Sequence, residues 1–176
     1  MIKTCVVIGM HRSATSLVAK ALATQIDMGA VFRPIADQPA GNWENTDFMQ
    51  LNIDILKAAG GSWDKPPSHE AIMAVRSRFK KRIKRLVGKF NDKHQPDGIW
   101  GWKDPRTVLT IELYKPFLIN PHYITIFRNP QEVAKSLQKR NGFSIEFGLD
   151  LASIYNSRII RFLMRNHEDI NCTPLD

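Results

Sequence analysis

The 176-residue chain has few cysteines and no long apolar run. Cys5 and Cys172 are too few for a disulfide framework or a cysteine metal site. No stretch approaches the roughly 20 apolar residues that cross a bilayer, and the N-terminus lacks the apolar segment of a signal peptide. We therefore expect a cytoplasmic protein with no membrane span and a single domain over residues 1–176. Its apolar content of 43% is enough for one core.

Acidic residues are missing from one long segment. Residues 71–90 hold eight of the 25 basic residues and none of the 17 acidic ones, so the charges of the remaining chain balance. Apolar residues recur there at helical spacing, which predicts an amphipathic helix with a cationic outer face. That face is either ordinary solvated surface or a collector of an anionic substrate, nucleic acid or membrane. The apolar positions are Ile72, Val75, Phe79, Ile83, Leu86 and Phe90.

Short β-branched runs alternate with helical patterns along the chain. The runs predict strands at residues 3–8, 99–103 and 122–127. The patterns predict helices at 15–26, 46–59, 107–117, 131–140 and 145–167, with a loop at 27–45. This alternation predicts a three-layer α/β fold with a mostly parallel sheet flanked by helices, in which ligands bind beyond the carboxyl ends of the strands. We expect the buried face of the first helix to consist of Leu17, Val18, Ala21, Leu22 and Ile26.

The loop "GMHRSATS" after the first strand lacks the lysine of the phosphate-binding pattern G-x-x-x-x-G-K-[ST]. Gly9 and Ser16 match that pattern, whereas Ala14 and Thr15 replace its second glycine and its lysine. A strand, a turn and a helix start still offer N–H groups and a positive dipole end to an anion. Without the lysine or an evident Walker-B aspartate, hydrolysis of a magnesium triphosphate is poorly supported. The loop instead carries the cation Arg12, beside His11, and the hydroxyls of Ser13, Thr15 and Ser16.

Charged residues also follow the other two predicted strands. In "FRNPQEVAKS", Arg128 ends a strand and Ser136 lies in the next helix, so the two side chains could converge on one phosphate. In "WKDPR", Lys103 ends the predicted second strand, and Asp104 and Arg106 follow it. The structural alternatives are an arginine that pairs with a carboxylate and an ion pair that stabilises a strand end.

The motifs "HRSATS" and "FRNPQEVAKS", about 115 residues apart, together resemble the sulfotransferase family that uses 3′-phosphoadenosine 5′-phosphosulfate. "GNWENTDFMQLN" and "WKDPR" look like the intervening segments of its bacterial and Golgi-type branches. The resemblance implies a P-loop-like α/β fold, that nucleotide as sulfuryl donor, adenosine 3′,5′-bisphosphate as product, and no metal. It assigns the 3′-phosphate to Arg128 and Ser136. The expected residues for the 5′-phosphosulfate are Arg12, Ser13, Ala14, Thr15 and Ser16, with His11 beside them.

The resemblance also implies roles in sulfuryl transfer to a hydroxyl or amine acceptor, either a small molecule or a carbohydrate. Arg12 is suited to the charge that develops on the leaving phosphate, and Lys103 adds a second cation. A hydroxyl acceptor needs a base, for which Glu44 in "GNWENTDF" is the first candidate, Asp104 the second and His11 the third. Glu44 is alternatively a helix-capping or surface residue.

Two departures from the family pattern leave alternatives open. Ala14 stands where the family has glycine, and no counterpart of the later segment that closes over the adenine precedes Asp176. The chain end is therefore either natural or a truncation. One alternative function is a P-loop kinase acting on a small molecule. The other is a basic anion- or nucleic-acid-binding module centred on residues 71–90, although we rank nucleic acid below a small-molecule or carbohydrate partner.

Overall fold

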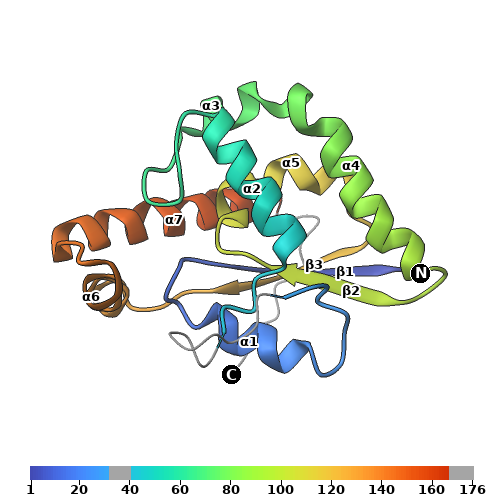
Figure 1. The fold of residues 1–176 in the computed structure, drawn as a ribbon, viewed down its shortest axis with the longest axis horizontal. Helices are drawn as coiled ribbons and strands as arrows, with labels where there is room; N and C mark the ends of the chain where they lie inside the picture. The colour runs from blue at the N-terminus through green and yellow to red at the C-terminus, as the bar shows by residue number, and fades with distance from the viewer. Residues whose placement is uncertain (32–40, 167–176) are drawn as a thin grey trace.

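The computed structural model describes residues 1–31 and 41–166, in which three strands alternate with helices (Figure 1). The strands are β1 (Lys3–Gly9), β2 (Ile99–Lys103) and β3 (Pro121–Ile126). The helices are α1 (Thr15–Leu22), α2 (Thr46–Ala58), α3 (His69–Ala74), α4 (Arg76–Lys93), α5 (Thr107–Tyr114), α6 (Pro130–Asn141) and α7 (Ile145–Arg165). A short 3₁₀ turn, η1 (Lys115–Phe117), follows α5.

The three strands form one parallel sheet in the order β2-β1-β3. Val6 in the central strand lies opposite Trp102 of β2 and Tyr123 of β3. All three carboxyl ends therefore reach the same edge of the sheet, which we call the carboxyl edge. The prediction of an α/β fold with a parallel sheet flanked by helices is confirmed in this form, with three strands in the described residues.

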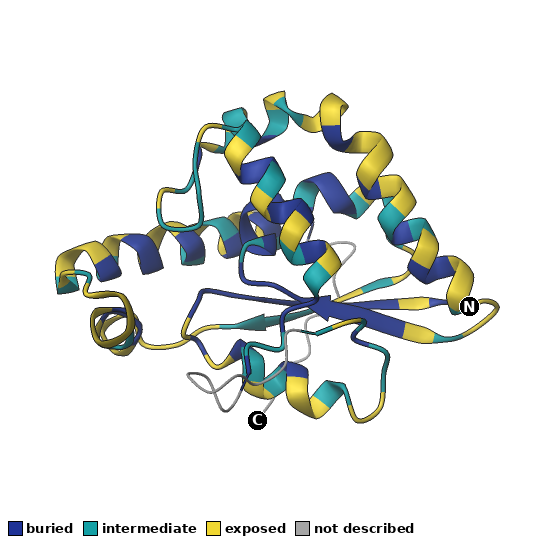
Figure 2. Cartoon of the chain, viewed as in Figure 1, coloured by how far each residue is buried: buried dark blue, intermediate teal, exposed yellow. Residues whose placement is uncertain are grey.

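Successive residues of β1 point to opposite faces of the sheet, as strand geometry requires. Val6 and Ile8 belong to the larger apolar core, which includes residues of α2, α4, α5 and α7. Val7 packs on the other face with Ala19 of α1 and Met28. Figures 1 and 2 show α1 on one side of the sheet and these four helices on the other, with buried residues turned toward the strands.

Two helix ends show why the predicted boundaries are close to the observed ones. Asn45 caps α2 by accepting from the N–H groups of Asp47 and Phe48. Helix α6 begins at Pro130, which suits the first helical turn, and ends before Gly142 at φ 71°. Such cap residues are visible in the sequence, and both helices lie within a residue of their predicted spans.

The first helix differs from the prediction. Helix α1 ends at Leu22 instead of Ile26, and Leu17 is 69% exposed rather than buried. Ala21 is exposed as well, whereas Ala19 is fully buried. Ala19 packs with Val7 and Met28, and the predicted residues Val18, Leu22 and Ile26 are partly buried against the same cluster.

The predicted basic helix over residues 71–90 is interrupted in the structure. It consists of α3, which Ser68 caps through Ala71 N–H, and α4, with Val75 between them at φ −89° and ψ 1°. The amphipathic character is confirmed, because Phe79, Ile83 and Phe90 are buried while all eight basic residues are exposed. Figure 2 shows this exposed outer side of α4.

The sequence also predicts that the last helix ends at His167 and that no helix spans a membrane. Cys172 and the predicted last helical residue, His167, lie outside the described residues. Among the helices of residues 1–31 and 41–166, none combines the length and apolar character that a membrane crossing requires.

Candidate functional site at the carboxyl edge

The loop between β1 and α1 adopts an unusual backbone conformation. Arg12 and Ala14 both have positive φ, at 67° and 66°, and Ser13 N–H donates to Met10 O at 3.2 Å. Ala14 occupies the N-cap of α1 and makes no side-chain cap bond. The first N–H groups of a helix have no intrahelical acceptor. The start of α1 therefore presents backbone donors beside an arginine, which is an arrangement suited to an anion.

Gly9 marks the beginning of this loop and is closely surrounded. A Cβ at this position would lie 2.5 Å from Thr15 Cγ2 and 3.0 Å from Ile126 O. The first distance is too short for a side chain unless Thr15 shifts, and the second is a tight contact with backbone. The absence of a side chain at Gly9 thus allows the end of β1, the start of α1 and the end of β3 to meet.

Replacing Ala14 with glycine is expected to raise the free energy of unfolding by about 0.5–1 kcal/mol. A non-glycine residue in the left-handed region costs roughly 1–2 kcal/mol, and glycine loses roughly 0.5–1 kcal/mol of chain entropy on folding. Ala14 is exposed, so its methyl group contributes little packing. Urea unfolding of the two proteins measures the difference. Lower stability in the variant would contradict a strained Ala14.

Arg12, Arg128 and Ser136 converge at the carboxyl edge although more than a hundred residues separate the first from the others. Arg12 Nε donates to Ser136 Oγ at 2.9 Å, and Arg128 Nη1 donates to Arg12 O at 2.9 Å. Arg128 also pairs with Glu132 at 2.9 Å across one turn of α6. Partial burial together with Arg140 and Arg128 lowers the pKa of Arg12. Crowded cations of this kind favour the binding of an anion among them.

Lys103 lies behind the loop and joins it to the second strand. Its Nζ donates to Ser16 Oγ at 3.2 Å and to Asn42 O, and it pairs with Glu44 at 3.5 Å. Only 2% of Lys103 is exposed, and burial lowers its pKa although Glu44 and Asp104 act in the opposite direction. Ser16 Oγ in turn donates to Asn42 O at 2.8 Å. Lys103 therefore connects the first turn of α1, through Ser16, to Asn42 and Glu44.

Asp104 and Arg106 complete a buried ionic cluster next to Lys103. Arg106 Nη1 lies 2.7 Å from Asp104 Oδ1 and 3.2 Å from Glu44 Oε2. Asp104 Oδ2 accepts from Asn52 Nδ2 at 2.8 Å. Burial would lower the pKa of Arg106, but the carboxylates of Asp104 and Glu44 outweigh it and raise that pKa. Two cations and two carboxylates thus balance one another in the interior.

The side chain of His11 is buried against Trp63 and is not exposed beside Arg12. Its ring lies 4.5 Å from that of Trp63 and 6.0 Å from that of Tyr155, and only 6% of the residue is exposed. Nε2 has no hydrogen-bond partner among the described residues. Burial, with Arg106 and other nearby cations, holds the pKa of His11 well below its usual range. The structure therefore places a neutral imidazole under the loop and not on its surface.

All predicted site residues lie at or next to the carboxyl edge, but in three separate settings. Ala14, Arg12 and Arg128 are exposed, and Ser136 beside them is half-buried. Glu44, Lys103 and Asp104 form a buried ionic cluster, and His11 packs among aromatic rings. Ser13 and Thr15 are buried, and Ser16 is half-buried.

Two residues near the site, Asn52 and Arg140, were not predicted from the sequence. Asn52 also accepts from Thr110 and Tyr114, and it holds Asp104 in place. A signal for it was present, because Asn52 is a polar residue at a core-facing position of α2, four residues after Phe48. Arg140 carried no comparable signal. Its proximity to Arg12 and His11 depends on how α6 packs.

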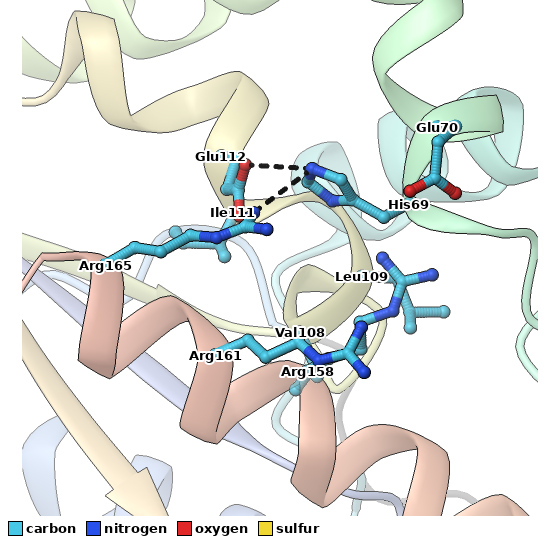
Figure 3. A pocket seen from close by; sticks show the side chains of 9 residues that line it. All are labelled: His69, Glu70, Val108, Leu109, Ile111, Glu112, Arg158, Arg161 and Arg165. Atoms are coloured by element: carbon cyan, nitrogen blue, oxygen red, sulfur yellow. Dashed lines mark hydrogen bonds and ion pairs between the residues drawn. The ribbon is translucent and has the colours of Figure 1, made fainter.

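A separate small cavity of about 40 Å³ lies among α3, α5 and α7, and none of the predicted site residues lines it (Figure 3). Within the cavity lining, Glu112 pairs with His69 at 3.5 Å and with Arg165 at 3.3 Å, so these three polar residues already interact with one another. The wall residues from α7 are Arg158, Arg161 and Arg165. We do not assign this cavity to the candidate site.

The fold and the carboxyl edge define an α/β protein with a small parallel sheet and a cationic surface beside a helix start. Comparison of the chain with protein-family models, with curated proteins and with solved structures finds no match. Among the residues described, no group of three or more histidine, cysteine, aspartate or glutamate side chains is arranged to hold a metal ion.

Proposed function

We propose that the protein is a sulfotransferase that takes a sulfuryl group from 3′-phosphoadenosine 5′-phosphosulfate. One observation carries the proposal. The residues that the family resemblance assigns to the two phosphate ends of that donor meet at the start of α1: Arg12 Nε donates to Ser136 Oγ, and Arg128 Nη1 donates to the backbone oxygen of Arg12. A chance similarity of two short motifs would not require the two segments to meet in the fold.

The donor set fits a nucleotide with phosphates at both ends. In the proposed complex, Arg12 and the N–H groups at the start of α1 bind the 5′-phosphosulfate. Arg128 and Ser136 bind the 3′-phosphate, for which Arg128 must release Glu132. That pair is exposed on both sides and separated by one helical turn, so breaking it costs little, about 0.3–0.5 kcal/mol. The P-loop-like character of the fold is part of this proposal.

Each candidate residue then has a distinct task in the proposed reaction. The bound donor supplies the sulfuryl group. Arg12 faces the leaving phosphate and stabilises its negative charge, while Lys103 adds positive charge from behind Ser16. Glu44 remains our candidate for the base that receives the acceptor proton, because it retains a little exposed surface, whereas Asp104 has none and His11 packs against Trp63. Both oxygens of Glu44 are paired, so Arg106 must move away before Glu44 accepts a proton.

The proposal is tested by comparing two nucleotides as stabilising ligands. At about 100 times its Kd, adenosine 3′,5′-bisphosphate is expected to stabilise the protein by about 2.7 kcal/mol, with no requirement for magnesium. ATP with magnesium is expected to stabilise it less at the same concentration, because it lacks the 3′-phosphate that Arg128 and Ser136 would bind. Thermal unfolding with each ligand measures both effects. Equal or greater stabilisation by magnesium ATP would instead favour a P-loop kinase.

A further inference from the structure

The cavity of about 40 Å³ among α3, α5 and α7 has a cationic wall and an apolar wall (Figure 3). Arg158, Arg161 and Arg165 of α7 line it, and their spacing along the helix places them on one face. The lining also holds Glu70 and Glu112, so three arginines stand against two carboxylates. The apolar wall comes from α5, and its residues are at most 4% exposed: Val108, Leu109 and Ile111.

The cationic wall still has unused hydrogen-bond donors. Arg165 pairs with Glu112 at 3.3 Å. Arg158 donates through Nη2 to Pro67 O at 2.8 Å and forms no ion pair within residues 1–31 and 41–166. Arg161 has neither a hydrogen bond nor an ion pair in that part of the chain. Because a guanidinium carries several N–H groups and no acceptor, Arg158 and Arg161 keep most of their donors available to an anion.

The crowding of these cations is unfavourable in itself. Burial lowers the pKa of Arg158, and Arg161 and Arg165 lower it further although Glu70 acts in the opposite direction. A negative ion between the guanidinium groups would offset this repulsion and supply acceptors for their unused donors. The cavity is therefore better suited to an anion than to water alone.

We propose that this cavity binds one inorganic phosphate ion, with Arg158 and Arg161 as cationic ligands and Glu70 as the acceptor for the hydroxyl of the ion. The proposal does not depend on the sulfotransferase function, because none of the residues assigned to that reaction lines the cavity. A volume of about 40 Å³ corresponds to about three water molecules. That is room for one small ion and not for a nucleotide or a sugar ring.

The carboxylate of Glu70 distinguishes phosphate from other small anions. Its own N–H and the Ser68 hydroxyl lower the pKa of Glu70, so it is ionised at neutral pH. An ionised carboxylate accepts hydrogen bonds and donates none. Hydrogen phosphate has a hydroxyl that can donate to it, whereas sulfate and the phosphodiester groups of nucleic acids have none and are repelled. Glu112 is less available, because it already pairs with His69 and Arg165.

The first test compares two variants with the same change in net charge. Arg161→Gln removes a proposed ligand, and Arg85→Gln, at an exposed position of α4, is the control. Both side chains are exposed, so both variants should fold, which circular dichroism establishes. Isothermal titration with sodium phosphate, in about 150 mM sodium chloride to screen long-range attraction, gives each affinity.

We expect Arg161→Gln to bind phosphate about tenfold more weakly than the unmodified protein, because a hydrogen bond to a charged group is lost. The control is expected to change by less than about twofold. An equal loss in both variants would mean that only overall charge matters and would overturn the proposal. Absence of phosphate binding by the unmodified protein would overturn it as well.

The second test measures the preference for phosphate over sulfate. The unmodified protein is expected to bind phosphate on the order of tenfold more tightly than sulfate, and Glu70→Gln should reduce this preference to about threefold or less. Equal affinities for the two ions in the unmodified protein would overturn the proposal, and an unchanged preference in Glu70→Gln would overturn the role of Glu70. Tighter binding of phenyl phosphate than of inorganic phosphate would overturn the assignment to the free ion.

A further variant separates the cavity from the carboxyl edge, which could bind the same ion. Arg12→Gln alters the loop after β1 and no residue that lines the cavity. We expect the phosphate binding that depends on Arg161 to persist in this variant, within about twofold. Loss of phosphate binding in Arg12→Gln with none in Arg161→Gln would place the ion at the carboxyl edge and overturn this inference.

Discussion

Replacing Asp104 with alanine is expected to lower the free energy of unfolding by about 3–5 kcal/mol, the usual effect of removing one partner from a buried ion pair. Asp104 has no exposed surface and receives hydrogen bonds from Arg106 and Asn52. Its loss leaves Lys103 and Arg106 with Glu44 as their one remaining carboxylate among the contacts described, so a net positive charge is buried. Urea unfolding measures the loss as a lower midpoint at an unchanged slope.

Glu112 provides the control for this experiment, because it pairs with His69 and Arg165 while its side chain is 28% exposed, whereas Asp104 has no exposed surface. Replacing Glu112 with alanine is expected to cost less than about 1 kcal/mol. A second comparison replaces Asp104 with asparagine, which preserves the shape and one acceptor oxygen but removes the charge. We expect an intermediate loss. A change below about 1 kcal/mol for Asp104→Ala would show that the buried cluster contributes little to stability.

Replacing Arg128 with alanine is expected to weaken the binding of adenosine 3′,5′-bisphosphate by roughly 10- to 150-fold, with much less effect on adenosine 5′-phosphosulfate. The first ligand has the 3′-phosphate that Arg128 would bind, and the second lacks it. A hydrogen bond to a charged group is worth about 1.5–3 kcal/mol, which corresponds to this range. Isothermal titration of each ligand gives the two affinities. Arg128 is exposed, so the protein should remain folded.

Glu132→Gln serves as the control for Arg128, because it weakens the ion pair between them and leaves the arginine in place. We expect equal or slightly tighter nucleotide binding in that variant. A similar loss for both nucleotides in Arg128→Ala would have a different meaning. It would indicate that Arg128 acts by holding the loop through its hydrogen bond to Arg12 O, and not by contact with a 3′-phosphate.

The strands and most helix boundaries could be predicted because their signals are local. A buried strand such as β1 is a short β-branched run, and caps such as Asn45 and Pro130 mark helix starts. The interruption at Val75 was not predictable in this way, because the apolar spacing continues through it. The inward position of Ala19 in place of Leu17 depends on how closely α1 approaches the sheet, which is a property of packing.

The candidate site was predictable in its residues but not in its connections. Parallel strands bring Arg12, Lys103 and Arg128 to the same edge, so their proximity follows from the fold class. The burial of Glu44 between two cations depends on the path of the loop before α2. The part of Asn52 in holding Asp104, and the ion pairs of Arg82 with Asp54 and Lys89 with Asp47, require the packing of α2 against its neighbours.

The crowding around Gly9 means that this position must be occupied by a residue without a side chain. The loop that holds Arg12 and the strand that leads to Arg128 are separate pieces of chain, yet a Cβ on Gly9 would lie 3.0 Å from the backbone oxygen of Ile126 and 2.5 Å from Thr15 Cγ2. A side chain here would require Thr15 or the end of β3 to shift, and both segments lead directly to the residues that position Arg12 and Arg128. The close packing of the carboxyl edge therefore depends on a residue that offers no functional group to a ligand.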